Sequence, residues 1–224
     1  MLTIENAETF GWEAAIRGMR SPKNSWDKSD SRWSLPDENG TDEPTYIIGE
    51  NDLKLMQTLA AAGQDHGKFL RMIHVQLDVT APLYWHKEAD QYKVGTVTDS
   101  CSTMHKIHAK EFTLDDFSHE HIINSVSMGD QEIEVRISPM QALLTTIECL
   151  NSYRELYLET KDKKYWWQLI QLLPSSYNQR RTWDLNYAVL RNIYHARRNH
   201  KIDEWHTLCN WIETLPYAKE LICG

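Results

Sequence analysis

The sequence lacks the features that would place it in several common protein classes. No apolar run reaches the roughly 18 residues that a membrane-spanning helix needs. The first residues carry neither the basic segment nor the apolar segment of a signal peptide. We therefore expect a cytoplasmic protein that has no membrane partner.

Short chemical motifs are also missing. The four cysteines are scattered without a C-x-x-C pair, so neither a zinc site nor a disulfide framework is expected. The nucleotide loops G-x-G-x-x-G and Walker A, the hydrolase motif G-x-S-x-G and the zinc motif H-E-x-x-H are absent. We expect no metal, and any nucleotide site must be built in another way.

Positive charge is scarce, with 24 basic residues against 32 acidic ones and a net charge of −8. This balance argues against a general nucleic-acid binder. The 224 residues, of which 41% are apolar, suffice for one sizeable domain or two small ones. We expect a single domain over residues 1–224.

The spacing of apolar residues predicts more helix than strand. One strand is clear at 73–80, where apolar and polar residues alternate, and weaker strand patterns occur at 94–98 and 131–137. Turn-forming residues predict a long loop at 21–46. Helices are expected at 50–62, at 82–93, over about 20 residues after Ser138, at 164–173, at 183–198 and at 203–215. The fold class is therefore α+β, helix-rich with a small antiparallel sheet.

Residues 180–201 concentrate positive charge in this acidic chain. Asp184 is the one acid among six cations, which are Arg180, Arg181, Arg191, Arg197, Arg198 and Lys201. Arginine suits phosphate and carboxylate, and like charges on one helix repel each other unless an anion lies among them. The segment is either an anion site or a solvated face that pairs with the acidic remainder.

A second candidate is the small, hydroxyl-rich stretch at 95–105, which follows a predicted helix. Such a stretch can turn backbone N–H groups and hydroxyls toward an anion, although an ordinary polar loop has the same composition. Cys101 lies four residues before His105, but a lone cysteine near a histidine is weak evidence for a nucleophile. We assign no catalytic residue.

Three segments, in order, resemble the flavin-dependent thymidylate synthases. The strand before Ala81-Pro82 and the helix after it lead into 91–103, where the family has the signature R-H-R-x-x-S-x-N-E-x-S-x-R. Leu173-Pro174, Trp183, Asn186, Leu190, Asn192 and Arg197 follow with the family's spacing. Residues 15–20 and Gly63–His66 resemble shorter family patterns near the start of the chain.

The resemblance implies a family fold in a homotetramer with active sites between subunits. It implies reductive methylation of dUMP to dTMP, with carbon from methylenetetrahydrofolate and hydride from FAD that NADPH reduces. The residues that it places at the nucleotide are Arg180, Arg197, Glu88, Gln91, Asp99, Cys101 and Ser102. Those that it places at the flavin are His66, Tyr92, Lys93, Asn186 and Asn192.

The signature itself is altered. Its Arg-His-Arg is Gln91-Tyr92-Lys93 here, and its last arginine is Thr103. Lysine lacks the arginine fork, and threonine removes a cation. Three interpretations stay open: a divergent thymidylate synthase, the same scaffold as another pyrimidine-nucleotide C5-modifying enzyme or non-catalytic binder, and an unrelated helical protein.

Overall fold

The computed structural model describes residues 1–34, 45–128, 131–133 and 137–224. The chain divides into two compact units, each built from three segments. Unit 1 consists of Met1–Thr3, Val79–Gln91 and Asp99–Arg181, and unit 2 consists of Ile4–Asp78, Tyr92–Thr98 and Thr182–Gly224. The division into one domain or two stays a prediction, and each unit is described by itself.

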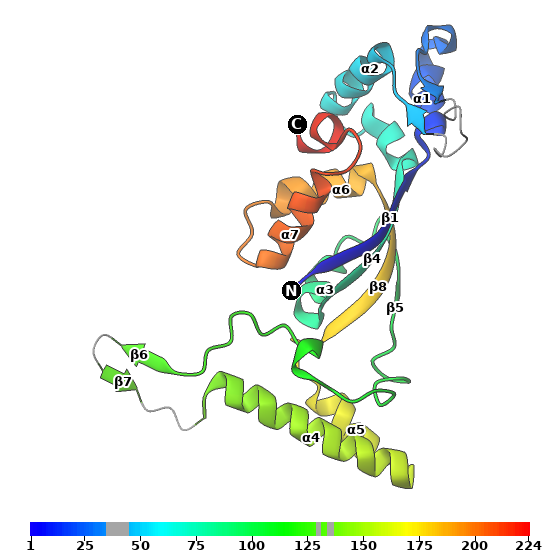
Figure 1. Ribbon diagram of the computed structural model, residues 1–224. Coiled ribbons are helices and arrows are strands. Elements are labelled where there is room, and N and C mark those ends of the chain that lie inside the picture. The colour runs from blue at the N-terminus through cyan, green and yellow to red at the C-terminus, as the bar shows by residue number, and fades with distance from the viewer. Residues whose placement is uncertain (35–44, 129–130, 134–136) are drawn as a thin grey trace, which may run out of the picture. The chain divides into compact units, whose positions relative to one another are not determined.

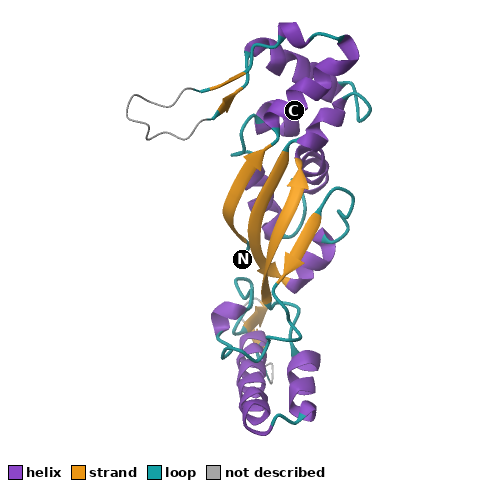
Figure 2. Ribbon diagram, turned by 90° about the vertical axis from the view of Figure 1, so that its right-hand side faces the viewer, coloured by secondary structure: helices purple, strands orange, loops and turns teal. Residues whose placement is uncertain are grey.

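A small antiparallel sheet supplies strands to both units (Figure 2). Its order is β1 (Thr3–Phe10), β4 (His74–Pro82), β8 (Asn178–Asn186) and β5 (Val97–Ser100). In β4 the apolar residues Val75, Leu77 and Val79 are buried while their neighbours are more exposed, because successive side chains of a strand point to opposite faces. The predicted strand at 73–80 is confirmed.

Unit 1 contains a helical hairpin. Its two helices, α4 (Pro139–Thr160) and α5 (Lys163–Leu172), pack side by side (Figure 1). Ser138 caps α4 by accepting a hydrogen bond from the Gln141 N–H, as expected of a serine before proline. Phe112, Phe117, Leu150 and Leu169 belong to the buried core of this region. The unit also contains α3 (Leu83–Ala89), the 3₁₀ turn η4 (Leu114–Asp116), and the strand pair β6 (Val126–Met128) and β7 (Gln131–Ile133).

Unit 2 is mainly helical. Its longer helices are α1 (Trp12–Arg20), α2 (Glu50–Ala61), α6 (Tyr187–Arg197) and α7 (Asp203–Ile212). Its shorter elements are the 3₁₀ turns η1 (Ser21–Lys23), η2 (Trp26–Lys28) and η3 (Gly67–Met72), the paired strands β2 (Arg32–Trp33) and β3 (Tyr46–Ile47), and the π-helical turn η5 (Lys219–Cys223).

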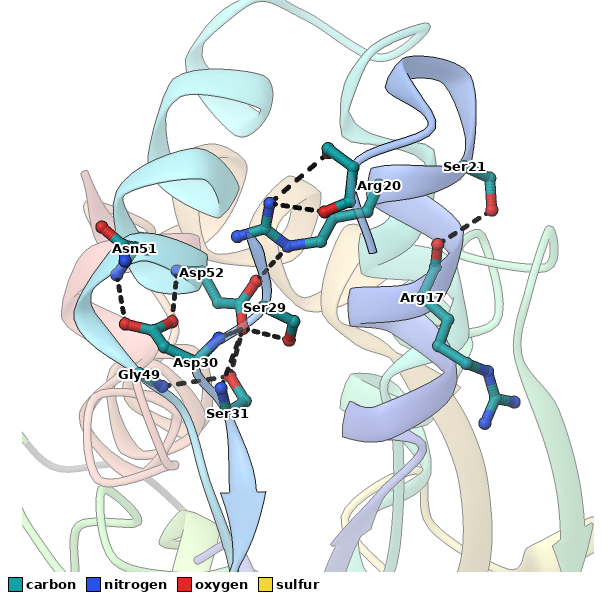
Figure 3. Close-up of polar contacts among 10 residues, drawn as sticks. Arg17, Arg20, Ser21, Ser29, Asp30, Ser31, Gly49, Asn51 and Asp52 are labelled. Atoms are coloured by element: carbon teal, nitrogen blue, oxygen red, sulfur yellow. Dashed lines mark hydrogen bonds and ion pairs between the residues drawn. The ribbon is translucent and has the colours of Figure 1, made fainter. Parts of the chain in front are cut away.

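A buried carboxylate ties the start of α2 to the segment before β2 (Figure 3). Asp52 is fully buried, and its oxygens accept hydrogen bonds from Ser29, Asp30 and Ser31 and from the Arg20 Nε 2.5 Å away. Asp30 in turn accepts hydrogen bonds from the Asn51 and Asp52 N–H groups, so it caps α2 from another segment. Burial is tolerated because every charge in the cluster is hydrogen-bonded.

The structure confirms the fold class and the helices expected at 50–62, after Ser138, at 164–173 and at 203–215. It differs at 183–198, where Trp183 lies in β8 and the helix begins only at Tyr187. The helix expected at 82–93 ends at Ala89. The expected loop at 21–46 contains η1, η2, β2 and the first residue of β3, and its residues 35–44 lie outside the described part.

None of the described helices combines the length and the apolar character that a bilayer crossing requires.

Candidate functional site

Unit 1 contains a cavity of about 620 Å³, a volume typical of small-molecule sites. We call it the unit 1 cavity. It brings together Arg180, Cys101 and Ser102, three of the residues that sequence reasoning assigned to the nucleotide. Its other lining residues are Met1, Thr3, Thr80, Thr103, Lys110, Asp115, Asp116, Phe117, His119, Glu120, Tyr177, Asn178 and Gln179.

Backbone pairing between the end of β5 and the start of β8 creates this proximity. The Cys101 N–H donates to the Arg180 carbonyl at 2.9 Å, and the Gln179 Nε2 donates to the Cys101 carbonyl at 2.7 Å. Gln179 is buried and Arg180 is exposed, as strand alternation requires. The start of β8 and the hydroxyl-rich stretch therefore both supply residues to the lining of the unit 1 cavity.

Ser102 organises the hydroxyl-rich stretch after β5. Its Oγ accepts hydrogen bonds from the Met104 N–H at 3.2 Å and the His105 N–H at 2.8 Å. A serine hydroxyl has two acceptor positions and one donor. With both acceptor positions used, the O–H remains to donate to a ligand oxygen.

Carboxylates limit where an anion fits in this cavity. Asp115, Asp116 and Glu120 line it together with the cations Lys110 and Arg180. Lys110 forms an ion pair with Asp116, which neutralises both charges. Arg180 and the neighbouring hydroxyls are donors in this lining, and donors of this kind suit a phosphate.

Three more residues assigned to the nucleotide also belong to unit 1. Glu88 is half-buried on α3, Gln91 lies in the turn that ends this helix, and Asp99 is exposed on β5. None of the three lines the unit 1 cavity. Their assignment to the nucleotide stays a prediction.

Arg197, the remaining candidate for the phosphate, lies in unit 2 against two aromatic rings. Its Nε donates to the Tyr92 hydroxyl at 2.8 Å, and its guanidinium carbon lies 4.8 Å from the centroid of a Trp205 ring. Stacking and hydrogen bonding together fix a guanidinium plane. The side chain is thus held at the end of α6, and its contact with a nucleotide stays a prediction.

The candidate flavin residues have different environments within unit 2. Asn186 is buried and caps α6: its Oδ1 accepts from the Val189 N–H, and its Nδ2 donates to the Gly95 carbonyl at 3.3 Å. A Cβ at Gly95, where φ is +81°, would lie 2.9 Å from that Nδ2, so only glycine allows this approach. His66, Lys93 and Asn192 are exposed.

Sequence reasoning missed most of the polar lining of the unit 1 cavity, including Thr80, Lys110 and Asn178. It also left Arg180 and Arg181 outside any expected element, just before the helix expected at 183–198, whereas both lie on β8. The spacing of residues 179–185 was the sequence signal that could have identified β8. Gln179, Trp183 and Leu185 stand at odd positions, as the residues of one strand face do, and all three are buried. Among the described residues, no group of three or more potential ligands is arranged for a metal ion.

No protein-family model matches the sequence, and no curated protein matches it either. Solved structures do match. The flavin-dependent thymidylate synthase ThyX from Helicobacter pylori, complexed with FAD and dUMP, is 14% identical, with a TM-score of 0.64 over 99% of this chain and 97% of that one. The UMP/dUMP methylase PolB from Streptomyces cacaoi, bound with 5-Br dUMP, is 13% identical, with a TM-score of 0.62 over 100% of this chain and 95% of that one.

This likeness shows that the chain has the fold of those two proteins over nearly its whole length. At such low identity the fold is shared, while ligand and activity have to be argued from the side chains present here.

Proposed function

We propose that this chain binds a pyrimidine nucleoside monophosphate in the unit 1 cavity and methylates carbon 5 of its base. In its most specific form the proposal is a divergent FAD-dependent thymidylate synthase of the cytoplasm, which converts dUMP to dTMP with methylenetetrahydrofolate and NADPH. The observation that carries it is the meeting of Arg180 with Cys101 and Ser102 in one cavity of nucleotide size.

The chemistry of this lining supports a phosphate. Arg180 supplies a permanently charged, planar donor fork, and Ser102 supplies an O–H beside it. Charge-assisted hydrogen bonds of this kind contribute about 1.5–3 kcal/mol each. The carboxamides of Asn178 and Gln179 are bonded at both ends within the unit, so the phosphate, and not the base, is the group that this lining supports.

The candidate flavin residues fit FAD in part. Lys93 is an exposed cation that suits a diphosphate, and His66 and Asn192 are exposed polar groups that would hold the flavin. Asn186 does not need a ligand, because both ends of its carboxamide are bonded within the unit. When bound, reduced FAD would supply the hydride of the reaction. In this chain, Tyr92 would act by orienting Arg197.

A second candidate function is a nucleotide-binding homologue without the methylation, or an enzyme that modifies C5 of another pyrimidine nucleotide. The observation that favours it is the hydrogen bond that ties Arg197 to Tyr92, at a signature position where the family has histidine. With Gln91 before it and Lys93 after it, the segment has one cation where the family pattern has two arginines. Fewer donors are then available to hold substrate and cofactor together.

We also propose the homotetramer that the family resemblance implies. The exposed apolar side chains Leu144 and Leu156 on α4 and Trp167 and Leu172 on α5 support an association through this hairpin. Light scattering of the purified protein tests the mass of the assembly directly. A monomer at micromolar concentration would contradict the proposed tetramer.

The deciding experiment compares calorimetric titrations with dUMP, UMP and deoxyuridine. The proposal predicts saturable binding of a monophosphate and at least about tenfold weaker binding of deoxyuridine, since the nucleoside lacks the phosphate. Failure of both nucleotides to bind would overturn the nucleotide site.

Complementation of a thymidine-requiring strain separates the two functions. Growth without thymidine supports the thymidylate synthase, and a protein that binds nucleotide but neither complements nor shows the visible absorbance of bound flavin supports the second candidate.

A further inference from the structure

Basic side chains gather in unit 1 where the segment after β5 contacts the helical hairpin of α4 and α5. We call them the basic cluster, and its members are Lys106, Arg154, Lys161 and Lys163. Within the described part of the chain, no member of the cluster forms an ion pair with a carboxylate. Lys110 and Lys164 in the same unit do pair with aspartates. Positive charge without a carboxylate partner stands out in a chain whose net charge is −8.

Hydrogen bonds tie the segment between Met104 and His108 to both helices of the hairpin. The Arg154 Nε donates to the His108 carbonyl at 3.0 Å, and the Trp166 Nε1 donates to the Met104 carbonyl at 3.0 Å. The His108 ring also packs edge-on against Tyr157 on α4, with 4.9 Å between ring centroids. The middle of this segment is therefore held beside the end of α4.

The cations of the cluster act on one another. Burial lowers the pKa of His108, and the positive charges of Lys161, Lys106 and Arg154 lower it further. These three cations therefore lie within electrostatic reach of one imidazole, and they repel one another unless an anion lies among them. Among the described residues Arg154 donates only through its Nε, so its terminal nitrogens remain to donate to a ligand.

The basic cluster and the apolar residue Leu156 occupy different faces of α4. Arg154, Tyr157 and the C-cap residue Lys161 follow one another at steps of three and four residues, so they share one face. Leu156 is two residues from Arg154, which is about 200° around the helix. Association through the Leu156 face therefore does not require the basic cluster to be covered.

Aromatic rings lie among these cations. The Lys161 ammonium lies 6.0 Å from the centroid of the Tyr157 ring, and the Lys163 ammonium lies 5.8 Å from that of a Trp166 ring. Both rings are half-buried, so part of each faces solvent. Single-stranded nucleic acid is bound by cations that follow the backbone together with rings on which bases stack. An acidic peptide would use the cations but not the rings, and a duplex hides the faces of its bases.

We propose that the basic cluster binds a short stretch of single-stranded nucleic acid. Lys106, Arg154 and Lys161 bind phosphates of the backbone. The rings of Tyr157 and Trp166 stack against bases. The acidic balance of the whole chain opposes such binding elsewhere on the surface, so the site is local. The inference does not depend on the proposed function of the unit 1 cavity.

The test is fluorescence anisotropy of the full chain with labelled strands of about ten riboadenylates or ten deoxyadenylates, which differ in the 2′-hydroxyl. Adenine is chosen because it is not a pyrimidine, and an excess of dUMP should displace neither strand. We expect saturable binding that weakens with salt, with a slope of about −2 in log K against log salt concentration for three neutralised phosphates. An abasic strand of the same length keeps the phosphates but lacks the bases, and it should bind at least about tenfold more weakly.

Lys106→Gln and Lys161→Asn are the test variants, and each removes one positive charge. Asparagine suits position 161, where φ is +58°. Each variant is expected to weaken binding of the tighter-binding strand about threefold or more and to make the salt slope shallower by about 0.7. Lys87→Gln is the matched control, because Lys87 is exposed on α3 in the same unit and is not part of the cluster.

The proposal is overturned if neither strand binds, if the abasic strand or a decaglutamate peptide binds as tightly as the adenylate strand, or if both test variants bind as tightly as Lys87→Gln. Displacement by dUMP would also overturn it, because the binding would then belong to the unit 1 cavity. Tighter binding of riboadenylate assigns the site to RNA, and tighter binding of deoxyadenylate assigns it to DNA.

Discussion

The Nε–H of Arg197 donates a hydrogen bond to the hydroxyl of Tyr92, and the two atoms lie 2.8 Å apart. The guanidinium carbon also lies 5.6 Å from the centroid of the Tyr92 ring and 4.8 Å from that of a Trp205 ring. Tyr92 stands where the signature of the flavin-dependent thymidylate synthases has a histidine, and it fixes the guanidinium of Arg197. We therefore propose that Tyr92 would act on a ligand through Arg197, as a positioning residue.

The family resemblance assigns Arg197 to the nucleotide phosphate, and on that assignment Tyr92→Phe is predicted to weaken dUMP binding about tenfold while it leaves the fold intact. The substitution removes one charged hydrogen bond, an interaction of about 1.5–3 kcal/mol, and keeps the ring that stacks on the guanidinium. Calorimetric titration of both proteins with dUMP measures the change. Arg197→Lys is the companion variant, and it is expected to bind no better than Tyr92→Phe, because lysine lacks the planar fork. Equal dUMP affinity in all three proteins would refute the positioning role.

Two adjacent arginines on β8, Arg180 and Arg181, are predicted to affect different properties of the protein, which are nucleotide binding and stability. Arg180 is exposed and lines the unit 1 cavity, whereas Arg181 donates to Asp90 at 2.6 Å and to Gln179 at 3.0 Å. Arg180→Ala should weaken nucleotide binding about tenfold or more, because it removes a cation from the lining of the cavity. Arg181→Ala should lower the unfolding free energy by about 1–3 kcal/mol, because it leaves Asp90 and Gln179 without their donor. Urea unfolding and dUMP titration of both variants separate the two roles, and similar profiles would contradict the assignment.

The sequence predicted correctly those helices and strands that are marked by a capping residue or by a clear apolar period within the segment itself. Ser138-Pro139 marks the start of α4, and the period of two in β4 marks its buried face. The end of the β8 strand was misassigned, because Trp183 also fits the helical spacing that continues through Tyr187 and Leu190. When a residue fits both the strand period and the helix period, its secondary structure depends on how the strand pairs in the folded chain. That pairing cannot be inferred from one segment of sequence.

For the candidate site, the sequence predicted single residues but not how they come together. Arginine chemistry pointed to Arg180, and the small polar residues pointed to Ser102, but their meeting depends on the pairing of β5 with β8. The hydrogen bond from Asn186 to the Gly95 carbonyl was not predicted, since it joins residues that are 91 positions apart.

Asp52→Asn is predicted to lower the unfolding free energy by about 3–5 kcal/mol, because it leaves the buried Arg20 guanidinium without its counter-charge. Burial opposes ionisation of Asp52, but hydrogen bonds from Ser31, Ser29 and Arg20 outweigh it and lower its pKa. The carboxylate therefore stabilises the fold at every pH above about 4, the value for an unfolded aspartate, and this stabilisation is lost as the pH falls through the lower folded pKa. Urea unfolding at neutral pH measures the loss.

Asp27→Asn serves as the control for that measurement, because Asp27 is exposed on η2 in the same unit. Its unfolding free energy should stay within about 0.5 kcal/mol of the parent value. A small loss for Asp52→Asn as well would mean that water reaches Arg20 and solvates it.

His86 predicts a pH dependence of stability in unit 1. It is fully buried on α3, its Nε2 lies 2.8 Å from the Gln179 carbonyl, and burial lowers its pKa to about 4. An unfolded histidine titrates near pH 6.5, so the unfolded chain takes up a proton first as the pH falls. The stability that neutral His86 contributes is full above about pH 6.5 and falls by up to about 1.4 kcal/mol per pH unit between there and pH 4.

His86→Gln cannot titrate in this range but keeps an N–H donor for the carbonyl. Urea unfolding between about pH 7 and pH 4 should therefore show the parent losing about 3 kcal/mol more than the variant. Parallel pH profiles would show that the folded imidazole is protonated as readily as the unfolded one, and that the site admits water.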